Sequence, residues 1–327
     1  MSEQALPDSV APPAGPVGPL WRRALVYVVF AVFAVWCAMA LRKDIAQIDL
    51  HPLREGWPLV LAAGALSLFN YALRVVRWQI YLRRLGHHLP WRFVSLTFMA
   101  GFAFTLSPGK LGEMVRARYY QPRGIPLASV TGAFFIERLL DLVVMILLAV
   151  VVLAELQAYR QFLWVAVGLV GGLLASVALV PWASVAEQGA RRDAAGLVKL
   201  VAPVARMLAS ARTFLSPHIL LAGMLLGLAA WGAEAVGLKL ISDILSPDKL
   251  SVPGAMGIYA IAIIVGALSF LPGGLGSTEA VMAALLYTHG FSTPQAILLT
   301  LICRLLTLWL AVLIGWVCVG LLRRERA

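Results

Sequence analysis

Charge is scarce in this chain. Only 13% of its 327 residues are Asp, Glu, Lys or Arg, whereas 61% are hydrophobic, and the mean hydropathy is +0.86. Soluble domains carry about 25% charged and about 45–50% apolar residues. The few charges could not cover a soluble globule of this size, which excludes an ordinary cytosolic enzyme, a disordered protein and a secreted disulfide scaffold. A polytopic membrane protein remains.

Signals for cofactors and metals are also missing. The three cysteines, Cys37, Cys303 and Cys318, lie in apolar runs without CxxC spacing, so neither a disulfide framework nor a metal site is predicted. The chain has no GxxxxGK[ST] loop for ATP. The pair His87-His88 lacks acidic or cysteine partners nearby and indicates a solvated interfacial pair rather than a metal ligand. We therefore expect no metal and no cofactor.

Basic residues exceed acidic ones by 27 to 16. In a membrane protein such an excess is typical of cytoplasmic loops and of contact with anionic lipid heads, so no nucleic-acid partner is expected. Residues 1–20 hold five of the 18 prolines and no apolar core, which predicts a disordered Pro-rich tail before a membrane domain at 21–327. A basic amphipathic segment at about 189–216, interrupted by Pro203, fits a cytoplasmic interfacial helix on an anionic leaflet.

Six apolar runs are long enough to cross a bilayer of roughly 30 Å as helices. They are Ala24–Leu41, Pro58–Leu82, Leu127–Ala154, Phe162–Val180, Ile219–Ile241 and Ala296–Leu322.

Two further apolar stretches are interrupted by proline and glycine. Phe93–Tyr120 is broken at Ser107-Pro108-Gly109, and Val252–Thr288 at Pro272-Gly273-Gly274. Both residue types end helices, so each stretch is either a broken span or a re-entrant hairpin. With two hairpins and cytoplasmic termini, inside loops hold 16 Lys and Arg against 5 outside. The positive-inside rule therefore favours hairpins over the rival, a simple eight-span protein.

The chain repeats a spacing of rare residues. Glu113 precedes Arg138 by 25 residues, as Glu279 precedes Arg304. The hairpin topology makes the two copies antiparallel, with repeat one at about 22–154 and repeat two at about 162–322. Such inverted repeats are typical of secondary transporters. We predict an all-α polytopic membrane protein with an inverted repeat of about four elements each and two re-entrant broken-helix hairpins; the alternative is chance similarity between apolar segments.

Eleven charged residues are predicted at membrane depth, where each costs roughly 2.5–3.5 kcal/mol. Because the set would cost on the order of 30 kcal/mol unpaired, its members must pair or line a hydrated cavity. The alternative to a functional site is a set of purely structural ion pairs. The eleven are Arg74, Arg77, Lys110, Glu113, Glu137, Arg138, Asp141, Glu234, Lys239, Glu279 and Arg304.

Arg138 has the spacing of an anion-binding residue. Glu137 and Asp141 are four residues apart and therefore lie on one helical face, and Arg138 is three residues from Asp141. An acidic side chain can therefore hold the Arg138 guanidinium while some of its N–H donors stay free. Arginine suits bidentate phosphate contact. Glycine-rich breaks also expose N–H groups at half-helix N-termini, which attract anions. Together these features indicate an anionic head group.

Several motifs in order resemble the flippase-like transmembrane region of the lysylphosphatidylglycerol synthase family, over most of the chain after residue 20. They are Arg74-Val75-Val76-Arg77-Trp78, Pro108-Gly109-Lys110-Leu111-Gly112-Glu113-Met114-Val115-Arg116, Glu137-Arg138-Leu139-Leu140-Asp141, Pro272-Gly273-Gly274-Leu275-Gly276-Ser277-Thr278-Glu279 and Arg304-Leu305-Leu306-Thr307-Leu308-Trp309. The resemblance implies a stand-alone member that lacks the family's soluble aminoacyltransferase domain.

The resemblance implies candidate head-group residues at Arg74, Arg77, Glu113, Arg116, Glu137, Arg138, Asp141, Glu279 and Arg304. Glu234 joins them as a charge predicted inside the membrane. The candidate loop backbone is Pro108, Gly109, Gly112, Pro272, Gly273, Gly274 and Gly276.

The predicted function is a lipid translocase that moves a phosphate-bearing lipid between leaflets. Its partners would be an anionic or zwitterionic phospholipid, an aminoacylated lipid or a polyprenyl-phosphate carrier, and a homo-oligomer is left open. We expect a transporter-like protein rather than an enzyme, with no catalytic residues; the alternative is a membrane-embedded transferase acting on a lipid-linked substrate. We expect it in the bacterial cytoplasmic (inner) membrane as a multi-pass protein with both termini cytoplasmic.

Overall fold

The computed structural model describes residues 51–155, 160–191 and 196–324. These ranges contain helices, turns and loops and no strand, as predicted for an all-α protein. The predicted tail at 1–20 and the predicted first span Ala24–Leu41 lie outside the described residues.

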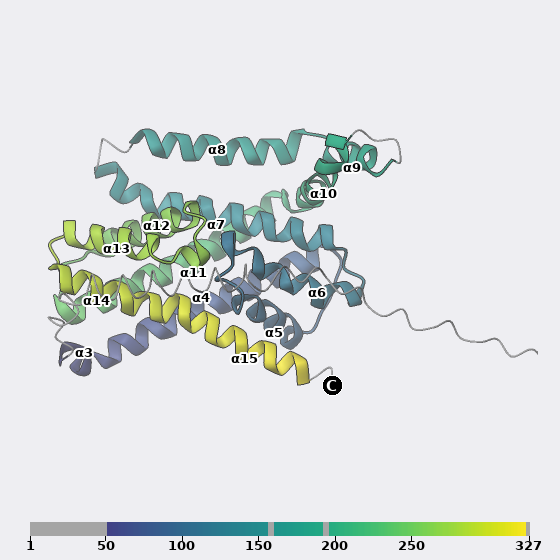
Figure 1. Cartoon of the computed structure of the whole chain (residues 1–327). Coiled ribbons are helices and arrows are strands. Elements are labelled where there is room, and N and C mark those ends of the chain that lie inside the picture. Colours follow the sequence, from purple (N-terminus) through teal and green to yellow (C-terminus); the bar gives the residue numbers. More distant parts are fainter. Residues whose placement is uncertain (1–50, 156–159, 192–195, 325–327) are drawn as a thin grey trace, which may run out of the picture. The chain divides into compact units, whose positions relative to one another are not determined.

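Each remaining predicted span coincides with a helix (Figure 1). The long helices are α4 (Trp57–Arg84), α7 (Leu127–Glu155), α8 (Arg160–Leu179), α11 (Pro217–Leu245) and α14–α15 (Thr293–Arg304 and Leu310–Arg324, joined by the π turn η6, Leu305–Trp309). The shorter ones are α3 (His51–Glu55), α5 (Trp91–Phe102), α6 (Ala117–Tyr120), α9 (Trp182–Ala190), α10 (Gly196–Ala211), α12 (Val252–Leu268), α13 (Ser277–Thr288) and the 3₁₀ turns η1 (Pro108–Arg116), η2 (Gln121–Arg123), η4 (Arg212–Phe214) and η5 (Pro272–Gly274).

Three helical segments in the described part are both long and apolar enough to cross a membrane: α4, α11 and α14–α15. A fourth crossing exists if α8 and α9, bent by 65° between Leu179 and Trp182, count as one. α7 is equally long, with 29 residues, but three charged residues interrupt its apolar sequence in the middle.

α4 and α11 pack antiparallel along their length. Gly56 before α4 lies against Ile244 at the end of α11, and Arg84 at the end of α4 donates to the Thr213 carbonyl oxygen (3.2 Å) before α11 begins. At mid-length the Asn70 amide donates to the Ala230 carbonyl oxygen (2.8 Å). This buried polar bond fixes the register of the two helices.

The first predicted break is present but begins earlier than the sequence suggested. α5 ends at Phe102 instead of continuing to Ser107, and η1 then begins at Pro108. Gly112 folds back so closely on the turn that a Cβ there would lie 2.6 Å from the Phe104 carbonyl oxygen. Its N–H donates to Ser107 Oγ (2.5 Å), so the chain must leave the helix before the proline.

The second break lies where the sequence placed it. α12 ends at Leu268 and α13 starts at Ser277. Between them Gly273, Gly274 and Gly276 have φ of 62°, 67° and 84°. Glycine adopts positive φ angles with little conformational strain, because it has no Cβ. This explains why glycine occupies all three positions.

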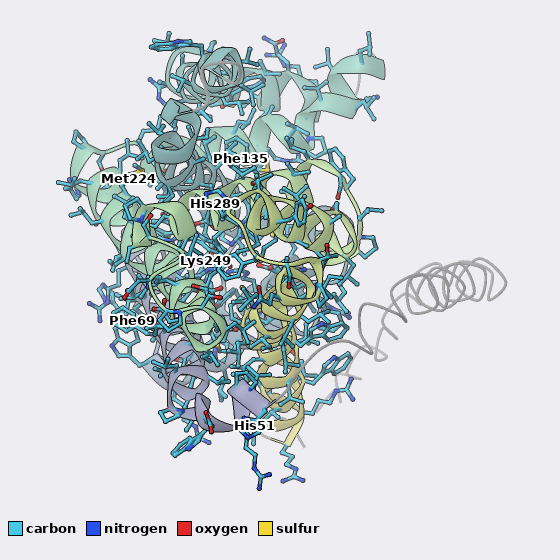
Figure 2. All side chains as sticks on the ribbon, turned by 90° about the vertical axis from the view of Figure 1, so that its left-hand side faces the viewer. His51, Phe69, Phe135, Met224, Lys249 and His289 are labelled. Carbon is cyan, nitrogen blue, oxygen red and sulfur yellow. The ribbon has the colours of Figure 1, made fainter. Side chains whose placement is uncertain are left out.

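Both interrupted segments bring their two ends together. The Arg123 guanidinium after α6 stacks on the Phe93 ring (3.2 Å) near the start of α5. Lys249 before α12 lies over the Phe291 ring (5.0 Å) after α13. Figure 2 looks onto this second end, where Lys249 and His289 are labelled. Each segment therefore leaves and returns to the same end of the bundle, and the two ends used are opposite.

α10 passes through Pro203 without interruption, contrary to the prediction. Pro203 is exposed, so the carbonyl that loses its helical donor can bond to water. Ala202, Ala205 and Ala211 are buried, while Leu197 and Leu200 are about three-quarters exposed, at 76% and 74%. α10 thus packs largely through small residues and leaves the leucines of its first half exposed.

Gly315 on α15 allows that helix to touch the end of α5. A Cβ at Gly315 would overlap the Ala103 backbone nitrogen and lie 2.8 Å from the Phe102 carbonyl carbon. We expect Gly315→Ala to lower stability by about 1–3 kcal/mol, because backbone cannot move aside as a side chain can. Gly320→Ala on the same helix is the control, since its Cβ would meet nothing within 4 Å. Thermal unfolding in detergent checks this, and equal melting temperatures for the two variants would contradict the packing.

Candidate functional site

A buried carboxylate on α7, Glu137, holds four arginines. Its side chain is 1% exposed. The four partners come from three elements, so Glu137 ties α4, η1 and α7 together. The shortest N–O distances are 3.4 Å to Arg74, 3.4 Å to Arg77, 3.3 Å to Arg116 and 2.8 Å to Arg138.

Two more carboxylates complete this arginine cluster, which we define as Arg74, Arg77, Glu113, Arg116, Glu137, Arg138 and Asp141. Asp141, one helical turn after Glu137, accepts from Arg77 (2.7 Å). Glu113 pairs with Arg116 (3.3 Å) and accepts from the Thr105 hydroxyl (3.1 Å). Four guanidinium groups face three carboxylates, so the ionised cluster carries a net charge of +1.

Aromatic rings surround the innermost arginines. The Arg116 guanidinium lies 4.3 Å from the Trp78 ring centroid and 4.6 Å from that of Phe98. Arg74 lies between the rings of Phe102 (5.2 Å) and Trp231 (5.3 Å). Desolvated cation–π contacts of this kind contribute about 2 kcal/mol or more, so these two arginines are fixed parts of the scaffold.

Arg74, Arg77 and Arg138 all have nitrogens without a hydrogen-bond partner, but Arg138 is the most exposed arginine of the cluster. Its side chain is 23% exposed, and a single nitrogen, Nη2, lies near Glu137 (2.8 Å), Asp141 (3.4 Å) and Glu113 (3.8 Å). Its buried Nε has no hydrogen-bond partner. Arginine has five N–H donors in a planar fork, so Arg138 can bind a further anion without leaving the carboxylates.

Arg304 forms a second, smaller site at the other break. Its Nε donates to Glu279 (2.6 Å), and its Nη2 donates to the Gly273 carbonyl oxygen (2.8 Å). The other oxygen of Glu279 accepts the N–H of Gly276 at the start of α13 (2.7 Å). Arg304 and Glu279 therefore fix the glycine-rich turn.

A cavity of about 350 Å³ joins the two sites. Arg138 and Asp141 line it from α7, Arg304 from α14, and Gly273 and Gly274 from the second break. The rest of its wall is mostly apolar. Its rim includes Leu268, Phe270 and Leu271, exposed by 68%, 72% and 43%.

A second cavity of about 50 Å³ lies against the first. Trp231, Ile263, Arg304 and Leu308 line both cavities. The smaller cavity is also lined by Tyr71, Arg74, Thr105, Glu113, Glu234 and Tyr259.

The candidate residues from the sequence fall into three groups. Nine of the ten lie in the arginine cluster or in the Arg304–Glu279 pair. Glu234 lies apart from the arginine cluster, on α11, and accepts from the Tyr259 hydroxyl (2.6 Å). Lys239 lies outside the site and pairs with Asp243 toward the end of α11. The loop residues Pro108 and Gly109 lie in η1.

Sequence reasoning missed the aromatic residues of the site, Trp231 above all. The Trp231 indole donates to Asp141 (3.0 Å), and Trp231 lines both cavities. Trp231 precedes Glu234 by three residues and therefore shares its helical face. This spacing could have pointed to Trp231 as a site residue. It did not stand out, because tryptophan is common in apolar helices.

Comparison with known proteins supports the resemblance found in the sequence. Residues 23–315 match the family described as "Lysylphosphatidylglycerol synthase TM region". A UPF0104 membrane protein of Methanothermobacter thermautotrophicus is 24% identical over 90% of this chain and 94% of its own length. A UPF0104 membrane protein of Pyrococcus horikoshii is 24% identical over 82% of this chain and 88% of its own. Both relatives are archaeal.

We expect Glu137→Gln to destabilise the protein strongly. The amide keeps the shape of the side chain but leaves four guanidinium groups, three of them buried, with two carboxylates. Removing one partner from a buried ion pair costs about 3–5 kcal/mol. Melting temperature in detergent is the measurement, and Glu187→Gln on exposed α9 is the matched control. A melting temperature as high as that of the control would show that Glu137 does not hold the cluster.

Proposed function

The chain belongs to the lysylphosphatidylglycerol synthase transmembrane-region family, and we propose that it is a lipid translocase that moves a phosphate-bearing lipid between leaflets. The larger cavity carries this proposal, because arginines from both halves of the chain meet in it under an apolar rim. A polar floor and apolar walls match a molecule with an anionic head and hydrocarbon tails.

The phosphate would bind between Arg138 and Arg304. Arg138 has an unpartnered donor, and arginine forks match phosphate geometry. The ionised residues on the cavity wall, Arg138 and Arg304 against Asp141, sum to +1, which favours an anion. The acyl chains would leave over Leu268, Phe270 and Leu271 and remain in the bilayer. Phospholipids, aminoacylated phospholipids and polyprenyl phosphates all fit this chemistry.

The packing of the helices supports an inverted repeat. α5 of the first half packs on α15 of the second half, and α12 of the second half packs on α7 of the first half. The helices α4 and α11, one from each half, pack on each other, and the two breaks, η1 and η5, are in contact. A two-fold relation that exchanges the halves would produce these pairings. Arg304 is bound to its own turn, whereas Arg138 is partly free. In the proposed cycle each of these two arginines is bound to its own half of the chain while the other is free for phosphate, and the two exchange roles as the cavity opens to opposite leaflets.

We place the chain in the cytoplasmic membrane with both broken segments as re-entrant hairpins and both termini inside. The contacts Arg123–Phe93 and Lys249–Phe291 support this, since each segment returns to the end at which it started. Basic residues gather at the end shared by Arg84, Arg123 and Arg212, as the positive-inside rule expects of a cytoplasmic face. The exposed leucines of α10 would lie in the adjoining interface.

Cysteine labelling tests this topology. In a background without Cys37, Cys303 and Cys318, single cysteines at Arg118 and Lys249, both exposed, would be labelled from opposite sides of sealed vesicles. The hairpins put Arg118 on the cytoplasmic side and Lys249 on the other. Labelling of both from one side would contradict them, because a fully crossing first segment would move Arg118 across the bilayer.

Reconstitution in liposomes tests the function. Wild-type protein should exchange a labelled anionic phospholipid between leaflets, and the variant Arg138→Ala/Arg304→Ala should lose at least about tenfold in rate, because one phosphate contact contributes about 1.5–3 kcal/mol. Arg206→Ala, on the exposed face of α10, is the matched control and should exchange normally.

Two results would contradict the proposal. Exchange that survives the double substitution would remove the arginine mechanism. Absence of exchange together with a covalently altered lipid would favour a membrane-embedded transferase.

A further inference from the structure

The smaller cavity has the size and polarity to hold water. Its volume of about 50 Å³ exceeds the roughly 10–15 Å³ that one water molecule needs. Tyr71, Thr105, Tyr259 and Glu234 are among the residues that line it, and such polar residues can supply the partners that a buried water requires.

Glu234 is an ionisable group deep in an apolar helix. It is 3% exposed, at residue 18 of the 29-residue α11. An ionisable residue at such a depth is by default functional. The Tyr259 hydroxyl bonds to it at 2.6 Å. A hydroxyl can donate to a carboxylate and can equally accept from a carboxylic acid, so this bond survives a change in protonation.

Charged and titratable groups from several elements packed around α11 lie near Glu234 or in the neighbouring packing. The Trp231 indole, one turn before Glu234 on α11, donates to Asp141 of the arginine cluster. The groups are Tyr71 and Arg74 of α4, Glu113 of η1, Asp141 of α7, Tyr259 of α12, and Cys303 and Arg304 of α14.

We infer that the smaller cavity is a proton-binding site in which Glu234 takes up and releases the proton. A hydronium ion in the cavity gives its proton to a carboxylate oxygen of Glu234, an O–H bond forms, and a water molecule remains. A sodium ion fits less well, because it would stay in the small cavity as an additional cation beside Arg74 and Arg304, whereas the proton ends in a bond to Glu234. Protonation of the carboxylate adds no ion to the space.

The proton site adjoins the phosphate site without being part of it. Arg304 lines both cavities, so a charge change at Glu234 acts on a residue that would bind phosphate. This coupling rests on the proposed function, whereas the proton site itself does not.

Infrared difference spectroscopy on the purified full-length protein tests the site directly. Acidification should produce the carbonyl stretch of a buried carboxylic acid, and Glu234→Gln should abolish that band completely. Tyr259→Phe keeps the carboxyl but removes its hydrogen bond, so the band should persist at a higher frequency. Glu187→Gln, which replaces an exposed carboxyl on α9, should leave the band unchanged.

Three results would overturn the proton site. They are the absence of a buried acid band in the wild type, a band that persists in Glu234→Gln, and loss of the band when potassium in the buffer is replaced by sodium at constant pH. The third would assign the cavity to a metal cation. Tyr259→Phe keeps the test valid if Glu234→Gln does not fold, because an unshifted band would also contradict the assignment.

Lipid exchange under a pH gradient tests the coupling separately. Wild-type exchange in liposomes should change several-fold with the gradient, and exchange by Glu234→Gln should be the same with and without it. Wild-type protein that exchanges no lipid would defeat the translocase, while the infrared band would still decide whether Glu234 binds a proton.

Discussion

Charge balance around Glu137 is the constraint on which the rest of the structure depends. Four guanidinium groups inside an apolar bundle are tolerable only because carboxylates and aromatic rings replace the water they lost. Since these arginines come from α4, η1 and α7, balancing their charge also fixes where the first break lies against the two long helices. The same ion pairs hold Arg138 and Asp141 in place on the wall of the larger cavity.

The two halves of the chain use the same pair of residues differently. Arg304 contacts Glu279 directly and closes the second turn. Arg138 is 3.8 Å from Glu113, because Glu137 competes for the same nitrogen at 2.8 Å. Among the described residues of the second half, no comparable arginine cluster surrounds Arg304. The spacing from Glu to Arg is shared, but the surroundings decide which arginine is free to bind.

Rare residues made much of this arrangement predictable from sequence. Charges inside apolar runs stand out, so nearly all members of both sites could be named from their cost of burial and from the family motifs. Trp231, Tyr259 and Tyr71 could not, because aromatic residues are common in membrane helices and only the fold shows which of them reach a cavity. The early end of α5 depends on Gly112 meeting Phe104, and the continuity of α10 at Pro203 depends on exposure; both are properties of packing rather than of local sequence.

In the proposed translocase the larger cavity would bind phosphate and the smaller one a proton, and Arg304 lines both cavities. With Glu234 and Glu279 both ionised, Arg304 faces two negative charges, and together the three groups sum to −1. When Glu234 takes up a proton, the sum becomes zero and Arg304 is more attractive to a phosphate, because an opposing charge in a low-dielectric setting has been removed. Thermodynamic linkage then requires the reverse effect, so that a bound phosphate favours the protonated form of Glu234. A proton gradient would therefore bias phosphate binding without any direct contact between proton and lipid.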